Sequence, residues 1–176
     1  VTRWAMGSVA EKILQATNNP LLIIRDQTGE GTSMIEGEKD SHDWNALLNV
    51  SNIIIPLDGS QLSEQVIPHA TALAHSLGVP VTPVRVSNSP NDDSENIEYL
   101  NNVAKGIRDS GLESSDGDIL HGNPATAIIQ MTETIPNSLV AMTTRGRSGI
   151  QRWVMGSVTD RVVRHSSSPA LVIRGT

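Results

Sequence analysis

The sequence predicts an α/β fold in which a parallel sheet lies between two layers of helices. Short apolar runs alternate with longer segments whose apolar residues recur at helical spacing, which is typical of α/β sandwiches. The chain has no Phe and only four aromatic residues, three Trp and one Tyr. Its core must therefore be aliphatic, which suits strands that are buried on both faces. We expect a three-layer sandwich.

The predicted elements follow one another from Asn52 onward. Residues 53–57 form an apolar run that predicts a central strand, and a turn follows it at residues 58–60. The next helix is expected to begin at Ser63 as its cap and to end at Gly78. Pro80 and Pro83 fit less well into the ladder of the second strand. The other strands are expected at residues 79–86, 118–121, 138–142 and 169–174, and the helices at residues 63–77, 97–107, 125–134 and 157–165.

An internal repeat divides the chain. Residues 3–25 recur at residues 152–174 with a constant offset of 149 positions, and ten of the 23 aligned residues are identical. A helix followed by a strand therefore occurs twice. We interpret residues 1–25 as the C-terminal helix–strand remnant of a first repeat and residues 52–176 as a complete domain. The polar residues 26–51 between them are expected to be a linker, in part a candidate for disorder.

Glycines, arginines and hydroxyls are concentrated between the expected strand at residues 138–142 and the expected helix at residues 157–165. Helix N-termini bind anions, and Gly156 would let the backbone approach a phosphate closely. A structural alternative stays open, because Ser157 and Asp160 have the spacing of a capping box and Ser157 could serve only as a cap. In the same way, Asp58 could accept hydrogen bonds from a ribose or an adenine amine, or could only form a turn.

Composition excludes several functions. The formal net charge of −6 argues against general nucleic-acid binding. The lack of Cys excludes disulfides, thiolate metal sites and a cysteine nucleophile, and is compatible with a cytosolic protein. No apolar run approaches the ~20 residues that a membrane helix needs. The signatures of the phosphate loop and the nucleophile elbow are missing, so we assign no catalytic residue.

Several short motifs between residues 53 and 174 occur in a characteristic combination. They are Ile-Ile-Ile-Pro-Leu-Asp-Gly-Ser at residues 53–60, Pro-His-Ala at 68–70, Gly-Asn-Pro at 122–124, Thr-Arg-Gly-Arg-Ser-Gly at 144–149, Val-Met-Gly-Ser-Val at 154–158 and Pro-Ala-Leu-Val-Ile-Arg at 169–174. This combination closely resembles the universal stress protein family. The resemblance implies a five-stranded parallel sheet in the order 3-2-1-4-5, with a ligand cleft between the first and fourth strands.

The resemblance also implies an adenine-nucleotide site. Members of the family that bind ATP carry Gly-x2-Gly-x9-Gly-[Ser/Thr], a motif that here falls on Thr143, Gly146, Gly156 and Ser157, so that Thr143 replaces the first glycine. By position, the adenosine would be contacted by Pro56, Leu57, Asp58, Val86 and Met142, and the phosphates by Arg145, Gly146, Gly156, Ser157, Val158 and Thr159.

We therefore expect a cytoplasmic universal stress protein that binds ATP, or AMP or ADP in its place, with Mg, as a sensor or regulator of the stress response. Hydrolysis would be slow at most. The alternative is a dimerisation or interaction module of the same fold that binds no nucleotide, which the replacement at Thr143 favours. The family also dimerises through its last strand. We expect residues 21–24 to pair with residues 171–174, within the chain or in a homodimer, and we expect neither a nucleic-acid nor a membrane partner.

Overall fold

The computed structural model describes residues 19–24, 49–87, 89, 92–144 and 155–175. Among them, six strands form one sheet in the order β1-β6-β5-β2-β3-β4. The five strands other than β1 run parallel, and β1 is antiparallel to β6. The strands are β1 (Leu21–Ile23), β2 (Asn52–Pro56), β3 (Val81–Ser87), β4 (Asp118–His121), β5 (Ser138–Thr143) and β6 (Ala170–Ile173). The predicted order 3-2-1-4-5 of the parallel strands is confirmed.

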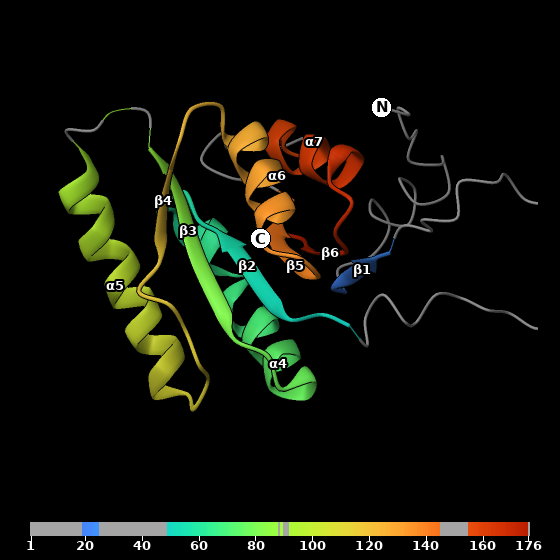
Figure 1. Ribbon diagram of the computed structural model, residues 1–176, viewed down its shortest axis with the longest axis horizontal. Helices are drawn as coiled ribbons and strands as arrows, with labels where there is room; N and C mark the ends of the chain where they lie inside the picture. The colour runs from blue at the N-terminus through green and yellow to red at the C-terminus, as the bar shows by residue number, and fades with distance from the viewer. Residues whose placement is uncertain (1–18, 25–48, 88, 90–91, 145–154, 176) are drawn as a thin grey trace, which may run out of the picture.

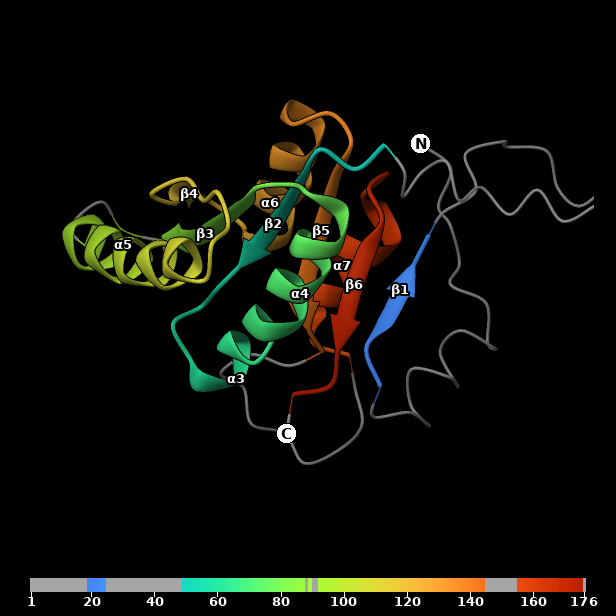
Figure 2. The same ribbon diagram turned by 90° about the horizontal axis from the view of Figure 1, so that it is seen from below.

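Helices cover both faces of this sheet, which gives the three predicted layers (Figure 1). The helices α3, α4 and α5 lie on one face, and α6 and α7 lie on the other. Figure 2 shows α4 in front of the sheet, with α6 and α7 behind it. The helices are α3 (Gln61–Glu64), α4 (Ile67–Leu77), α5 (Asp93–Asp109), α6 (Pro124–Thr134) and α7 (Ser157–His165).

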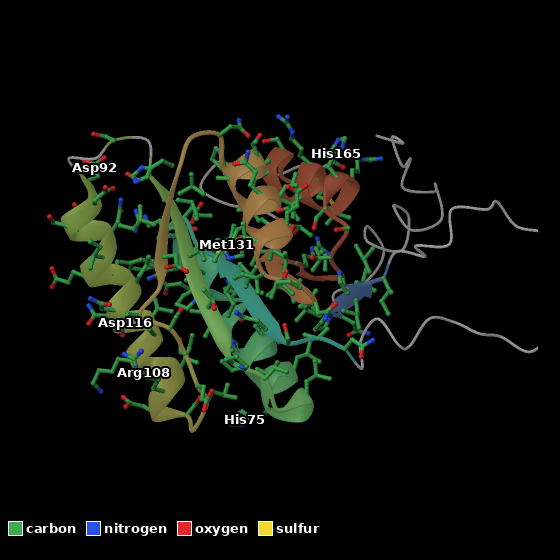
Figure 3. The ribbon with its side chains drawn as sticks, viewed as in Figure 1. His75, Asp92, Arg108, Asp116, Met131 and His165 are labelled. Carbon is green, nitrogen blue, oxygen red and sulfur yellow. The ribbon has the colours of Figure 1, made fainter. Side chains whose placement is uncertain are left out.

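The aliphatic core is divided by the alternation of side chains along each strand. Ile53 and Ile55 of β2 pack with Ala70 and Ala74 of α4 on one face. Ile54 of the same strand packs on the other face against α6, where Met131 lies between helix and sheet (Figure 3). All three isoleucines are fully buried. The continuous apolar run therefore serves two cores at once, as expected for a central parallel strand.

The helix predicted at residues 63–77 is divided in two, and its predicted cap is wrong. Ser60, not Ser63, caps α3: its side chain accepts a hydrogen bond from the Ser63 N–H. Pro68 then lies in the first turn of α4. Because Pro has no N–H, it cannot donate to the carbonyl of Glu64 four residues earlier, and the helix cannot continue through it. Gly78 ends α4 in the left-handed conformation, at φ +66°, as predicted.

Pro83 lies inside β3, a strand between β2 and β4, and it does not break a hydrogen bond of either ladder. The Val81 N–H donates to the carbonyl of Glu113, on the side of the sheet where β4 follows. Backbone N–H groups alternate in direction along a strand, so the missing N–H of Pro83 falls on this same side. The ladder between β3 and β4 begins only at Val84, opposite Asp118. The proline therefore lies where no partner strand requires a donor.

The first strand closes the edge of the sheet next to β6. Leu21 faces Val172, Leu22 faces Leu171, and Ile23 faces Ala170. Leu21 and Ile23 pack against a small core that contains Val163 of α7, whereas Leu22 is 36% exposed. The two segments expected to pair, residues 21–24 and residues 171–174, thus meet within the chain, but the three pairs join residues 21–23 to residues 170–172.

Candidate functional site

A cavity of about 340 Å³ opens at the carboxyl ends of β2 and β5, where the connections leave towards opposite faces of the sheet. Ligands of open α/β sheets bind at such a switch point. The cavity has an apolar wall and a polar rim of hydroxyls, a carboxylate and the start of α7. The lining residues are Pro56, Leu57, Asp58, Ser63, Val86, Pro124, Ile128, Met142, Thr143, Gly156, Ser157, Val158 and Thr159.

Ten of the twelve residues predicted to contact a nucleotide line this cavity. They come from four separate parts of the chain and are Pro56, Leu57, Asp58, Val86, Met142, Thr143, Gly156, Ser157, Val158 and Thr159. The other two, Arg145 and Gly146, lie outside the described residues. The structure therefore brings the predicted residues together, and their contacts with a ligand stay a prediction.

Three lining residues were not predicted. Pro124 and Ile128 belong to the first two turns of α6, and Ile128 packs with Val86 and Met142 to form the apolar wall. Ser63 lies in α3 next to the rim. The Gly-Asn-Pro motif at residues 122–124 was a signal for the α6 residues, because it predicts the start of a helix that follows a strand end. Ser63 had a competing interpretation as a helix cap.

The loop that carries Asp58 is held by hydrogen bonds of its own residues. The Ser60 N–H donates to Asp58 Oδ1 over 2.9 Å, and the Ser60 hydroxyl donates to the same oxygen. The Ser63 hydroxyl in turn donates to the Ser60 carbonyl over 2.8 Å. Asp58 therefore forms the predicted turn while it also lines the cavity. The two interpretations of Asp58 do not exclude each other, because a carboxylate accepts several hydrogen bonds.

The junction between β5 and α7 forms the opposite rim. Thr143, at the end of β5, is only 6% exposed. Its carbonyl accepts a hydrogen bond of 2.8 Å from the Thr159 hydroxyl, and the Gly156 N–H donates to the carbonyl of Thr144. These bonds hold the start of α7 against the strand end. The Thr159 proton is already used in this bond, so this hydroxyl can offer a ligand only its oxygen.

The capping interpretation of Ser157 is wrong. The N-cap of α7 is Gly156, so Ser157 is the first residue of the helix and is exposed. Among the described residues, no side chain caps this helix start. Asp160, the other residue of the expected capping box, pairs with Arg164 over 2.7 Å. Since the first-turn amides of a helix have no partners within the helix, they can receive an anion at the rim of the cavity.

Tyr99, in α5, is the only tyrosine of the chain, and its environment shifts its pKa. Burial, together with the hydrogen bond and the negative charge of Glu64, raises the pKa of Tyr99 well above its ordinary value. The Tyr99 hydroxyl donates to Glu64 Oε1 over 2.9 Å. Tyr99 therefore stays a neutral hydrogen-bond donor at physiological pH.

The described residues contain no group of three or more His, Cys, Asp or Glu side chains that could hold a metal ion. None of the described helices is long and apolar enough to cross a bilayer.

The fold agrees with a comparison of the sequence against protein-family models. Residues 49–174 match the model of the universal stress protein family. The chain belongs to this family. A universal stress protein of Methanocaldococcus jannaschii is 29% identical over 138 residues, which cover 69% of this chain and 81% of that protein.

Solved structures of universal stress proteins have the same fold. One from Archaeoglobus fulgidus superposes with a TM-score of 0.72 at 21% identity, over 99% of this chain and 57% of that longer chain. A universal stress protein from the same organism, in complex with dAMP, has a TM-score of 0.59 at 21% identity, over 71% of this chain and 98% of its own. A universal stress protein in complex with cAMP has a TM-score of 0.57 at 19% identity, over 72% of this chain and 98% of its own.

Proposed function

We propose that this universal stress protein binds an adenine nucleotide, with ATP as the first candidate, and acts as a nucleotide-dependent sensor or regulator of the stress response in the cytoplasm. One observation carries the proposal: ten residues predicted from the family resemblance line a single cavity at the switch point of the sheet. The complexes of two relatives with dAMP and cAMP support the same ligand class.

The chemistry of the cavity fits the two ends of a nucleotide. Val86, Ile128 and Met142 offer an apolar wall for a base. Asp58, across the cavity mouth, can accept hydrogen bonds from ribose hydroxyls. The uncapped start of α7 at Gly156 offers amides and the positive end of the helix dipole to phosphates. Magnesium would then be held mainly by the phosphates and water, as is usual for nucleotide-bound Mg²⁺.

The decisive experiment asks directly whether the protein binds an adenine nucleotide. Small molecules released from freshly purified protein are identified by mass spectrometry, and ATP, ADP, AMP and cAMP are titrated by calorimetry. We expect one adenine nucleotide to be released or to bind. If none of the four binds at millimolar concentration, the proposal fails.

The second candidate function is an interaction module that keeps the fold but leaves the cavity without a nucleotide. Thr143 favours it, because this residue occupies the position where the ATP-binding motif has a glycine. The same calorimetry separates the two candidates. Retained partner binding in a variant with a blocked cavity would support the module.

For the organisation of the chain, we propose that residues 1–25 are the end of a first repeat, that residues 26–51 are a linker and that residues 52–176 form the complete domain. The pairing of β1 with β6 supports this proposal, as does the alignment of nearly the whole chain with a longer universal stress protein. A homodimer through β6 would require β1 to leave this edge. Sedimentation analysis of the chain with and without residues 1–25 tests which arrangement forms.

A further inference from the structure

We propose that Arg85 is a positioning residue of the nucleotide site, which holds the loop carrying Asp58 by stacking on Tyr99 and packing on Gly59. This inference rests on the proposed function. Arg85 lies in β3, immediately before Val86, which lines the cavity, but is not itself a lining residue. Its effect on a ligand would therefore pass through the loop.

The first contact of Arg85 is with α5. Side chains alternate along β3, so Arg85 points to the face opposite to Val86, where α5 packs. Its guanidinium carbon lies 4.9 Å from the centre of the Tyr99 ring. This distance is within the range of cation–π interactions, and a planar guanidinium can stack on an aromatic face. The ring therefore holds the guanidinium beside α5.

The second contact is with the backbone of the loop. Gly59 has a φ of +78°, and a Cβ atom there would lie 2.7 Å from Arg85 Nη1 and 3.0 Å from both Cζ and Nη2. The guanidinium therefore lies close against Gly59, and a side chain at this position would displace the end of Arg85. Gly59 lies between Asp58 and Ser60, which form the hydrogen-bonded turn. Arg85 thus contacts the middle of the loop that orients the Asp58 carboxylate.

The third element of this arrangement is the anchor of Tyr99. The Tyr99 hydroxyl donates to Glu64 Oε1 over 2.9 Å, and Glu64 belongs to α3, the helix that Ser60 caps. The loop is therefore held in the middle by Arg85 and at its end by the bond between α3 and α5. Four elements, β2, α3, β3 and α5, meet at this point, on the side of the sheet away from the apolar wall.

The chemical consequence concerns the ribose. If Asp58 accepts hydrogen bonds from ribose hydroxyls, its orientation decides how well a nucleotide is distinguished from its dideoxy analogue. Loss of Arg85 should therefore weaken ribose-dependent binding and leave base and phosphate contacts largely unchanged. A residue that only stabilises the fold would change both ligands equally.

The test compares Arg85→Met and Arg85→Lys with the parent protein by titrating AMP and 2′,3′-dideoxy-AMP. We expect Arg85→Met to bind AMP about tenfold more weakly, the scale of one hydrogen bond to a charged group, with a change of less than about twofold for the dideoxy compound. Arg85→Lys keeps the charge but loses the flat stack, so it should behave like Arg85→Met. If Lys preserves AMP binding, or if both ligands weaken equally, the proposal is overturned.

The matched control is Arg108→Met. Arg108 also lies on this face of the sheet, and its guanidinium pairs with Asp116 over 3.0 Å. Arg108 lies in the last turn of α5, far from Asp92 at the start of this helix (Figure 3). This variant should bind both nucleotides like the parent protein. The pair Tyr99→Leu and Tyr99→Phe completes the series: removal of the ring should reproduce Arg85→Met, whereas removal of the hydroxyl should preserve the stack.

A measurement without ligand separates this inference from the proposed function. Amide hydrogen exchange of Ser60, whose N–H donates to Asp58 Oδ1, reports the order of the loop directly. We expect the Ser60 amide to exchange about tenfold faster in Arg85→Met and at an unchanged rate in Arg108→Met. Thermal unfolding curves verify that every variant is folded. If the parent protein binds no nucleotide, the proposed function fails, and this measurement still decides the role of Arg85. Unchanged Ser60 protection in Arg85→Met overturns the inference.

Discussion

Leu22 of β1 faces Leu171 of β6, and the two leucines are equivalent residues of the internal repeat, 149 positions apart. The pairs on either side follow the same symmetry: Leu21 faces Val172, and Ile23 faces Ala170. The two strands are therefore related by a local twofold axis that passes between the leucines. This is the geometry of an isologous contact, which here forms inside one chain.

The two faces of β1 should respond differently to truncation. Ile23→Ala removes methyl groups that pack against the core containing Val163, and we expect it to lower the free energy of unfolding by about 1–2 kcal/mol. Leu22→Ala should change this free energy by less than about 0.5 kcal/mol, because Leu22 is exposed. Urea unfolding measures both. Equal effects would mean that β1 does not pack as described.

At the start of α7, stability and binding should change in opposite directions. Gly156→Asp introduces a good N-cap, so we expect the protein to gain a few tenths of a kcal/mol. Its carboxylate would occupy the anion position at the first-turn amides, and nucleotide affinity should fall at least about tenfold. Gly156→Asn has the same shape without the charge and isolates the electrostatic part. Denaturant unfolding and calorimetry measure the two effects, and undiminished binding by Gly156→Asp would exclude phosphates from this position.

Thr143 is the departure from the ATP-binding motif, and its replacement tests whether the side chain restricts the cavity. We expect Thr143→Gly to strengthen ATP binding and to destabilise the protein by about 1 kcal/mol, because glycine is unfavourable in a strand. Thr143→Ser keeps the hydroxyl and removes the methyl group, so its affinity for ATP should lie between those of the parent protein and Thr143→Gly. Weaker ATP binding by Thr143→Gly would indicate that Thr143 contributes to the site.

The single tyrosine provides a direct pH test. Absorbance of tyrosinate reports Tyr99 alone, and we expect it to appear well above pH 10 in the folded protein but near pH 10 in guanidinium chloride. Between these two values the unfolded chain has lost the proton that the folded chain keeps. Stability should therefore be unaffected by this group below pH 10 and fall above it, by up to about 1.4 kcal/mol per pH unit. Tyr99→Phe should lack this component of the slope, and coinciding folded and unfolded titrations would contradict the buried position.

Sequence patterns predicted the parts of this molecule that depend on local order. The alternation of apolar runs and helical spacing placed every parallel strand and the start of α7 at Ser157. The resemblance to the family named the residues at the two strand ends, Asp58 and Thr143, that line one cavity. Hydrophobic patterns and family motifs are both formed by residues that are neighbours in the sequence. They can therefore be recognised without knowing which segments pack together in the fold.

The missed features depend on contacts between distant segments or on the position of a single residue. The stack of Arg85 on Tyr99 joins a strand and a helix, and no spacing rule indicates it. The cap of α7 was wrong by one residue, which was enough to turn Ser157 from a cap into an exposed helix residue. The division of the first predicted helix, unlike these two features, had a local signal in the sequence. Pro68 is a residue that interrupts helices, so its effect could have been predicted.

The position of α7 has a consequence for communication across the molecule. Its first turn forms a rim of the cavity, whereas Val163 farther along belongs to the small core against which Leu21 and Ile23 of β1 pack. A ligand that fixes this helix would change the free energy with which β1 docks, and by linkage the docking of β1 would change ligand affinity by the same factor. Protection of the Ile23 amide, which faces β6 in the ladder, is measured with and without ATP and gives that factor. A partner that binds beside β1 could then sense through α7 whether the cavity is filled.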